Sequence, residues 1–524
     1  MPLDRVFDKR LAALVNSRGS GALQGGLKGV EKESLRVTPR GLIVKTPHPQ
    51  ALGSALTNEH ITTDYSEALI ELVTPAFPES WELLQYLCDL HRFVYERMEE
   101  ELLWATSMPC AIKGDESIPI AQYGKSNVGR MKTVYRHGLG HRYGRVMQAI
   151  SGVHFNYSFP EHLWPLLGEI LTTSDTGQGF RSDLYFALLR NYRRHGWIVL
   201  YLFGNSPALC SSFLQGRKVD GLREFMPGTL YAPYATSLRM SDLGYRNKSQ
   251  AGLNVSVNSL DHYIRDLTRA ISTPHPPYEK LGVRVDGEYR QLNANLLQIE
   301  NEYYSFIRPK RVTQSGERPT KALRRGGVQY VEMRSLDVSA FDPVGVNQNK
   351  LRFLEAFAAY CALSDSLPIE NSEQAELDGN HALVAREGRK PGLVLRRDGR
   401  DAPLKDWALE IVDAMRGVCA LLDEGDAQRP YTTALEAQEA KVRNVALTPA
   451  ARTLEEMRTN EESFFNLALR MSKLHKAYFL DLYSPNESRQ DEFAAEAQQS
   501  IEAQARIEAS DRLSFDAYLA NYFA

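Results

Sequence analysis

Acidic residues on an otherwise apolar strand face are the first sign of chemistry in this sequence. In GVEKESLRV, an extended strand would place Glu31 and Glu33 on the face that also carries apolar side chains. Buried carboxylates are costly unless they are protonated or paired with cations, so a metal-lined cavity would explain the pattern. A surface strand, in which Lys32 and Arg36 screen the acids, explains it equally well.

A second acidic cluster lies in TTDYSEALIELVTP, where Asp64, Glu67 and Glu71 are close in sequence. Glu67 and Glu71 share a face whether the segment forms a strand or a helix, because they are four residues apart. Hard cations such as Mg²⁺ bind a few carboxylate oxygens and keep positions free for phosphate oxygens. An exposed acidic helix is the alternative interpretation.

Two further segments alternate between polar and apolar residues in the manner of strands. One places His154 and Asn156 on a polar face opposite an apolar one. A single histidine is more often structural than a ligand, so both interpretations of His154 stay open here. The other segment places Glu332 beside Arg334, an acid for a cation next to a guanidinium for phosphate, although a simple cross-strand ion pair is the alternative.

The segment LQIENEYYSFIRPKR combines acids with a following basic cluster. An extended strand would place Gln298, Glu300, Glu302 and Tyr304 on one face. Arg308, Lys310 and Arg311 come next and offer positive charge for a triphosphate.

The elements that must position these residues alternate between strands and helices up to about residue 340. We expect strands at 30–37, 67–74, 152–159, 296–305 and 328–336. We expect helices at 4–16, 80–104 and 181–203, and a wholly helical pattern after about residue 400. In that region an apolar stripe runs from Leu404 to Leu422, and residues 486–524 read as a solvated helix that packs back through Phe515, Tyr518 and Tyr522. The expected domains are 1–400, catalytic, and 401–524, a helical region packed on it.

The composition indicates a globular protein that acts on small molecules. The chain has 524 residues, 43% of them hydrophobic, and a formal net charge of −3, which offers no field to attract nucleic acid. Its five cysteines are far apart and form no CxxC pair, so we expect neither a zinc knuckle nor a disulfide framework. This cysteine usage fits a reducing cytoplasm, and the charged N-terminal segment and the short apolar runs predict no secretory signal and no membrane segment.

Taken together, several segments closely resemble proteobacterial glutamate–cysteine ligase, the type 1 family of gamma-glutamylcysteine synthetases. They run in colinear order from about residue 25 to about residue 395 and include EGRKPGLVL. The others are GVEKESLRV, HPQALGSALTNEHITTDYSEALIELVTP, TVYRHGLGHRYG, ISGVHFNYSF, YLFGNSPALCSSFL, YATSLRMSDLGYRNKSQ, LQIENEYYSFIRPKR and YVEMRSLDV. The resemblance implies an α+β fold, in which a curved antiparallel β-sheet funnel similar to the catalytic sheet of glutamine synthetase is surrounded by helices.

The resemblance also implies roles for particular residues. The implied metal ligands are Glu31, Glu33, Asp64, Glu71, His154 and Glu332. The implied amino-acid pocket consists of Tyr135, Gln148, Asn156, Arg239, Tyr245 and Tyr304. Arg136 and Arg334 resemble the arginines that contact the phosphoryl group, and Arg308 and Lys310 are candidate contacts to the ATP phosphates.

The implied activity is the ATP-dependent joining of the γ-carboxylate of L-glutamate to the amine of L-cysteine through a γ-glutamyl phosphate. The implied cofactors are about two or three Mg²⁺ or Mn²⁺ ions, the implied partners are small molecules only, and a monomer is expected. Cys210 is expected to serve packing, because this chemistry needs no covalent nucleophile on the enzyme. Two rivals are a ligase that uses another amine and a silent binding protein that keeps the fold, although the presence of all six implied metal ligands disfavours the latter.

Overall fold

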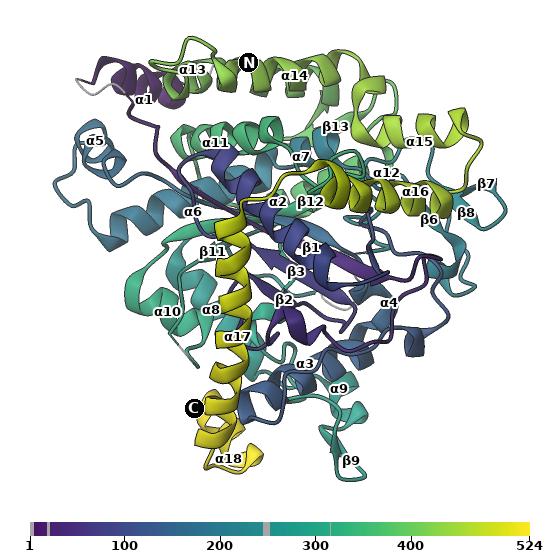
Figure 1. The fold of residues 1–524 in the computed structure, drawn as a ribbon. Helices are drawn as coiled ribbons and strands as arrows, with labels where there is room; N and C mark the ends of the chain where they lie inside the picture. Colours follow the sequence, from purple (N-terminus) through teal and green to yellow (C-terminus); the bar gives the residue numbers. More distant parts are fainter. Residues whose placement is uncertain (1–4, 18–20, 245–251, 315) are drawn as a thin grey trace.

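Strands from distant parts of the chain form a seven-stranded antiparallel sheet at the centre of the molecule (Figure 1). The structure is a computed structural model that describes residues 5–17, 21–244, 252–314 and 316–524. The strand order is β11-β12-β5-β1-β3-β2, and β4 pairs with the end of β1. The strands are β1 (Leu27–Val37), β2 (Ile61–Thr63), β3 (Leu69–Val73), β4 (Leu102–Leu103), β5 (Gly152–Ser158), β11 (Ile307–Lys310) and β12 (Tyr330–Asp337). The expected α+β class with an antiparallel sheet is confirmed, and the funnel shape stays a prediction.

Strand β1 is buried on both faces, which decides between the two interpretations of its charges. Lys32 and Arg36 are 3% and 0% exposed on the face opposite Glu31 and Glu33. The Lys32 ammonium donates to Ser34 Oγ at 2.5 Å, and burial lowers its pKa to about 7. Arg36 donates to the Glu101 carboxylate at 2.8 Å. The surface-strand alternative is therefore wrong, because both basic residues have their own buried environment.

Strand β5 has the two faces that its alternation predicts. Val153, Phe155 and Tyr157 are at most 1% exposed and belong to the main hydrophobic core. His154 and Asn156 point the other way, toward Glu31. Alternation therefore separates the core side of the sheet from the polar side.

The expected strand at 296–305 is wrong. This segment contains only the short 3₁₀ helix η5 (Glu300–Glu302), and β11 begins after it. The acids of the segment are buried in ion pairs: Glu300 lies 3.1 Å from Arg318 and Glu302 lies 2.9 Å from Arg142. Each acid is thus held by its own buried arginine, and the segment does not form the common strand face that the alternation predicted.

Helices surround the sheet; one of the expected helices is shorter than predicted and another is divided in two. The segment 80–104 forms a helix only to Arg97 before β4 begins, and the segment 181–203 is divided at Gly196. The helices before residue 400 are α1 (Arg5–Asn16), α2 (Ser80–Arg97), α3 (Asn127–Tyr143), α4 (Arg145–Gln148), α5 (Leu163–Ile170), α6 (Gln178–His195), α7 (Trp197–Phe203), α8 (Leu260–Ser272), α9 (Pro276–Leu281), α10 (Pro319–Gly326), α11 (Gln348–Leu363) and α12 (Asn371–Glu387). Small hairpins and edge strands are β6 (Ala208–Cys210), β7 (Arg223–Met226), β8 (Thr229–Tyr231), β9 (Arg284–Val285), β10 (Glu288–Tyr289), β13 (Val394–Arg397) and β14 (Arg400–Pro403).

The region after residue 400 is helical, as expected. Its helices are α13 (Leu404–Leu422), α14 (Pro430–Arg443), α15 (Pro449–Thr459), α16 (Phe464–Ala477), α17 (Glu487–Ser510) and α18 (Phe515–Phe523). The predicted stripe of α13 is buried, and it joins the same core as the helices α6 and α7. The expected tail helix is broken into α17 and α18, and Figure 1 shows α17 running along the molecule to α18 beside α3. The domain boundary at 400 stays a prediction.

No helix within the described ranges combines the length and apolarity that a bilayer crossing requires.

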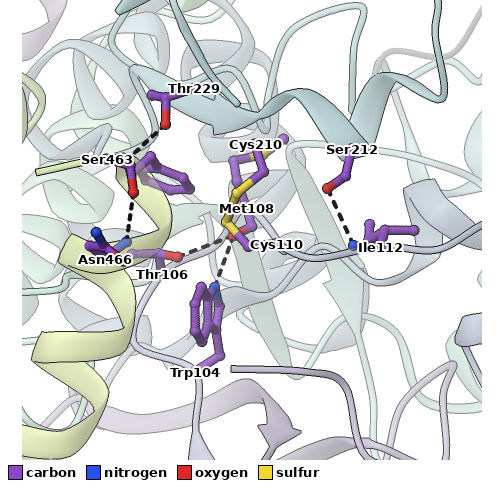
Figure 2. Close-up of a disulfide and its surroundings, with 11 residues drawn as sticks. Trp104, Thr106, Met108, Cys110, Ile112, Cys210, Ser212, Thr229, Ser463 and Asn466 are labelled. Atoms are coloured by element: carbon purple, nitrogen blue, oxygen red, sulfur yellow. Dashed lines mark hydrogen bonds between the residues drawn. A yellow bond between two sulfur atoms is a disulfide. The ribbon is translucent and has the colours of Figure 1, made fainter. Parts of the chain in front are cut away.

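A disulfide joins Cys110 to Cys210, which corrects the expectation that the cysteines form no bridge (Figure 2). The two Cα atoms lie 5.3 Å apart although the residues are 100 positions apart in the chain. Strand β6 brings Cys210 beside the segment that follows β4, where Ile112 N donates to Ser212 Oγ at 3.2 Å. Sequence spacing could not show this contact, because only the fold brings the two segments together. Cys210 is buried, as its expected packing role requires.

Thiol counting tests the disulfide directly. Protein prepared without reductant and unfolded in denaturant should titrate three thiols, from Cys88, Cys361 and Cys419, and five after reduction. Reduction should also lower the free energy of unfolding by about 2–5 kcal/mol, because the bridge closes a long loop in the unfolded chain. Five thiols in the unreduced sample would contradict the bridge.

Candidate active site

The pairing of four neighbouring strands lines up acidic residues across the sheet. Glu33 of β1 lies opposite Glu71 of β3, and Glu31 lies opposite His154 of β5. On the next strand, Glu332 lies opposite Asn156 of β5. Like charges directly across a strand pair destabilise a sheet, so this arrangement requires a compensating positive charge.

His154 is the centre of this group, which we call the carboxylate centre and define as Glu31, Glu33, Asp64, Glu71, His154 and Glu332. Its Nδ1 atom lies 3.0 Å from Glu31 Oε2 and 3.7 Å from Glu332 Oε1. Ligand atoms of Glu31, Glu71 and His154 all lie within 4.8 Å of one another. The structure thus brings together residues from four strands and from the turn after β2.

Two buried atoms of the carboxylate centre have no hydrogen-bond partner, namely His154 Nε2 and Glu332 Oε2. A buried polar atom without a partner is costly, and both atoms can donate a lone pair to a cation. Carboxylate oxygens with one imidazole nitrogen are a donor set that suits a divalent ion. The residues therefore fit the metal that the resemblance implies.

The acids of the carboxylate centre differ in pKa because their neighbours differ. Burial, and then the charge of Asp64, raise the pKa of Glu33 to about 8, and burial also raises that of Glu71 well above its usual value. Burial opposes ionisation of Glu332 too, but Arg334 and Lys310 outweigh it and hold the pKa of Glu332 well below the usual range. Without a cation, the centre keeps protons on part of its carboxyl groups.

The carboxylate centre lies in a cavity of about 410 Å³. All six of its members line the cavity, and so do seven of the other residues that the resemblance implies, which are Tyr135, Arg136, Gln148, Tyr304, Arg308, Lys310 and Arg334. Arg334 Nη1 lies 3.0 Å from Glu332 Oε1, and Lys310 Nζ lies 3.4 Å from the same oxygen. Positive side chains thus border the acids on one side.

Helix α3 supplies another wall of the cavity. Ser126 caps its first turn by accepting a hydrogen bond from the backbone of Gly129, which fixes where the helix begins. Lys132, Tyr135 and Arg136 then follow at helical spacing and line the cavity together. The Arg136 guanidinium donates to the carbonyl oxygen of Lys132 at 2.9 Å, so it is held along the helix.

A polar wall next to α3 contains Gln148 and Tyr304. The Gln148 amide donates to the Tyr304 hydroxyl at 2.8 Å. The Tyr304 ring also packs edge to face on Tyr143, at 5.9 Å between ring centres. The two side chains are fixed relative to each other and leave a polar surface toward the cavity.

Three residues of the implied amino-acid pocket are not among those that line the cavity. Asn156 lies next to it and donates to Glu31 Oε1 at 2.9 Å. Arg239 is 0% exposed and donates to the Arg334 carbonyl oxygen at 3.0 Å. Tyr245 lies outside the described residues.

Glu67 belongs to the predicted acidic cluster but not to the cavity. Its carboxylate accepts hydrogen bonds from the backbone of His48 and of Gln122, both at 2.8 Å. Glu67 therefore holds two loops in place. Of the predicted acidic cluster, only Asp64 and Glu71 belong to the carboxylate centre.

Comparison with known proteins identifies the family. A model described as glutamate-cysteine ligase matches residues 11–384. A glutamate–cysteine ligase of Pseudomonas putida KT2440 is 49% identical over 522 residues, which cover 100% of this chain and 99% of that protein. The chain belongs to the glutamate–cysteine ligase family. The resemblance expected from the motifs is confirmed.

Solved structures agree with this family membership. A glutamate–cysteine ligase of Francisella tularensis, crystallised in complex with AMP, has a TM-score of 0.90 at 36% identity and covers 96% of this chain and 99% of its own. A bifunctional glutathione synthetase of Pasteurella multocida has a TM-score of 0.69 at 23% identity and covers 94% of this chain and 57% of its own. The second likeness shows the fold alone.

Several residues line the cavity of this member of the glutamate–cysteine ligase family without having been predicted. They are Tyr65, Met131, Lys132, Leu139, Met147, Ile299, Asn301, Thr313, Glu317, Pro319 and Tyr522. Glu302, which the sequence placed on a candidate face with Tyr304, also lines it. Lys132 could have been found from its helical spacing to Tyr135 and Arg136. Tyr522 carries no such signal, since it is distant in sequence and was expected only to pack.

The raised pKa of Glu33 predicts a pH effect on stability in the absence of metal. Folded Glu33 keeps its proton up to a pH of about 8, whereas the ordinary value is 4.5. Between these values the folded state binds more protons than the unfolded state, so stability falls as the pH rises through this window. Glutamine cannot ionise, so the Tm of Glu33→Gln relative to wild type should increase from roughly pH 6 to pH 8 in EDTA. Tm curves that stay parallel would contradict the shift.

Proposed function

We propose that this chain catalyses the ATP-dependent ligation of L-glutamate to L-cysteine, with the cavity around the carboxylate centre as its active site. Membership of the glutamate–cysteine ligase family supports the reaction. The observation that carries the assignment of the site is the convergence of Glu31, Glu33, Glu71, His154 and Glu332 on one cavity bordered by Arg334 and Lys310. Acids for a cation beside cations for phosphate are the combination that phosphoryl transfer needs.

The carboxylate centre would hold divalent ions, which we propose to be about two or three Mg²⁺ or Mn²⁺. Such ions would neutralise charge on the β- and γ-phosphates of ATP. Support comes from the partnerless His154 Nε2 and Glu332 Oε2 atoms and from the raised pKa of Glu33 and Glu71. These are properties expected of ligands whose cation balances their charge.

In the first step, an oxygen of the glutamate γ-carboxylate bonds to the γ-phosphorus of ATP, and the bond from that phosphorus to the bridging oxygen breaks. ADP leaves and γ-glutamyl phosphate remains. Arg334 and Arg136 would contact the phosphoryl group in transfer, while Arg308 and Lys310 would bind the remaining phosphates. The side chain of Arg334 is well placed for this role, because its 3.0 Å contact to Glu332 holds it at the edge of the carboxylate centre.

In the second step, the cysteine amine bonds to the carbonyl carbon of γ-glutamyl phosphate. The bond from that carbon to the phosphate oxygen breaks, and the nitrogen loses a proton. The products are γ-glutamylcysteine and phosphate. Tyr135, Gln148 and Tyr304 would form the amino-acid pocket, because the fixed Gln148–Tyr304 pair offers donors and acceptors for an amine and a carboxylate. Asn156, Arg239 and Tyr245 remain proposed contributors to the same pocket.

The direct test measures ADP release from ATP with L-glutamate, with and without L-cysteine. Fast release is expected only with both amino acids and Mg²⁺, with one γ-glutamylcysteine formed per ADP. Release that does not respond to cysteine, or that is faster with another amine, would contradict the proposed acceptor. We further propose that the enzyme is a cytoplasmic monomer. Gel filtration with light scattering tests the oligomeric state.

The attacking atom in this scheme is nitrogen, so the thiol should not be essential. L-2-aminobutyrate, which has a methyl group in place of the thiol, should be a substrate with a higher KM than L-cysteine. Tyr304→Phe should raise KM for cysteine a few-fold, or by about 1 kcal/mol, and leave KM for ATP nearly unchanged, because it removes the hydroxyl that Gln148 binds. An unchanged cysteine dependence would exclude Tyr304 from the pocket.

A further inference from the structure

Part of the cavity lining is not used by the proposed chemistry. It includes Ile299, Thr313, Pro319 and Tyr522, which carry no charge, and also the acid Glu317. The carboxylate centre, by contrast, would bind phosphates through the cations that it holds. The cavity therefore offers groups for a charged part and for an aromatic part of one ligand.

Tyr522 reaches this end from the C-terminal helix α18. Phe515 and Leu519 of α18 are buried in a small hydrophobic cluster with Met131 and Val134 of α3, and Tyr522 packs against the same cluster one turn later. Figure 1 shows α18 beside α3, at the end of α17 and away from α13 to α16. Met131 of α3 and Tyr522 of α18 thus pack on one cluster and line the same cavity.

The position of α18 is fixed by hydrogen bonds to the start of α3. The backbone N–H of Asn127 donates to the Asp511 carboxylate at 2.5 Å, and the Asn127 amide donates to the Leu513 carbonyl oxygen at 3.0 Å. Ser514 then caps α18 by accepting from the backbone of Ala517. These contacts make α18 a rigid neighbour of the cavity and not a free tail.

The direction of β11 indicates where a nucleoside would lie in the cavity. Tyr304 precedes this strand and belongs to the proposed amino-acid pocket, whereas Thr313 follows it. Between them, Arg308 lies opposite Glu332, and Lys310 lies 3.4 Å from the same acid. If phosphates bind along these basic residues, as the proposed function requires, the nucleoside extends past Lys310 toward Thr313, which lines the same cavity as Tyr522.

We propose that Tyr522 is a nucleoside-binding residue of the ATP site, and that its ring contacts the adenine base. The inference rests on the proposed function for the location of the phosphates. A tyrosine suits this role because its ring offers an apolar face for stacking and its hydroxyl remains a donor at the edge. Burial raises the pKa of the Tyr522 phenol above its usual value, so the hydroxyl keeps its proton at neutral pH. Helix α18 is then a part of the active site that the motifs before residue 400 do not contain.

The test compares Tyr522→Ala with Tyr518→Ala, a matched change on the same helix. Both tyrosines pack on the same cluster, but only Tyr522 lines the cavity. Tyr522→Ala should raise KM for ATP and Kd for ADP about fivefold to tenfold, and its KM for cysteine should stay within about twofold of wild type. In Tyr518→Ala, KM for ATP and Kd for ADP should also stay within about twofold of wild type. Binding of inorganic tripolyphosphate with Mg²⁺ should be unchanged in Tyr522→Ala, because this probe has no nucleoside.

Three outcomes would overturn the inference: an unchanged Kd for ADP in Tyr522→Ala, an equal loss of tripolyphosphate binding, or an equal effect of Tyr518→Ala. If alanine at 522 prevents folding, Tyr522→Leu gives the same comparison, since it keeps the apolar contact with the cluster and removes the aromatic face. Failure of the proposed function has a different signature, because wild-type protein would then release no ADP with glutamate and cysteine.

Discussion

Replacing Glu31 by glutamine should lower kcat by about a hundredfold or more, because a cation that stabilises a transferred phosphoryl group contributes several kcal/mol. Glu31 is held by two neighbours, since Oε1 accepts from Asn156 at 2.9 Å and Oε2 lies 3.0 Å from His154. Glutamine keeps the size of the side chain but removes the charge. The protein should therefore still fold, and the loss should appear in turnover and in the dependence on Mg²⁺.

The matched control for this variant is Glu67→Gln. Glu67 is also a buried acid near the sheet, but its carboxylate binds the backbone of two loops and does not line the cavity. We expect Glu67→Gln to lower the Tm and to keep the Mg²⁺ dependence of wild type, measured by titrating Mg²⁺ at saturating substrates. Near-normal turnover of Glu31→Gln at limiting Mg²⁺ would show that Glu31 is not a ligand.

Replacing Arg334 by lysine should lower kcat by roughly ten- to a hundredfold, with a smaller change in KM for glutamate. The planar guanidinium can bind two phosphoryl oxygens while its Nη1 stays 3.0 Å from Glu332, and a single ammonium cannot keep both contacts. The charge itself is preserved in this variant. The loss of kcat relative to wild type therefore reports the contribution of the planar guanidinium geometry at the phosphoryl group.

Steady-state kinetics with varied glutamate and varied ATP separate the possible roles of Arg334. The control is Arg416→Lys, since Arg416 pairs with Glu439 on the C-terminal helices and lies outside the cavity. It should have wild-type kcat. An Arg334→Lys variant that changes only KM would assign Arg334 to binding of the ground state and contradict a role in transfer.

Much of the sheet and the carboxylate centre could be predicted from alternation within single strands. On β5 the polar residues His154 and Asn156 alternate with apolar ones, so the local pattern predicts the face of His154. On β1 the alternation places Glu31 and Glu33 on one face and the basic residues on the other. The family resemblance then predicted that residues of these strands belong to one site. Both kinds of inference work because each relevant residue lies on a regular element.

Sequence patterns failed where long-range contacts decide the local structure. Glu300 and Glu302 alternate as a strand would, but buried pairs with Arg318 and Arg142 hold them in a turn. Cys110 and Cys210 meet only because β6 packs beside a distant segment. Tyr522 reaches the cavity only because α17 and α18 cross the molecule to α3, and nothing within the last turn of the chain indicates this.

The opposite charges on the two faces of β1 also bear on how the sheet assembles. This strand pairs with β3 on one side and with β5 on the other. A shift of one residue during folding would turn Lys32 into the cavity and Glu31 toward the interior that now surrounds His91. A wrongly paired sheet would then bury unmatched charges on both faces, which penalises it against the native pairing. The acids proposed to bind the cation therefore also mark the correct alignment of the central strand while the chain folds.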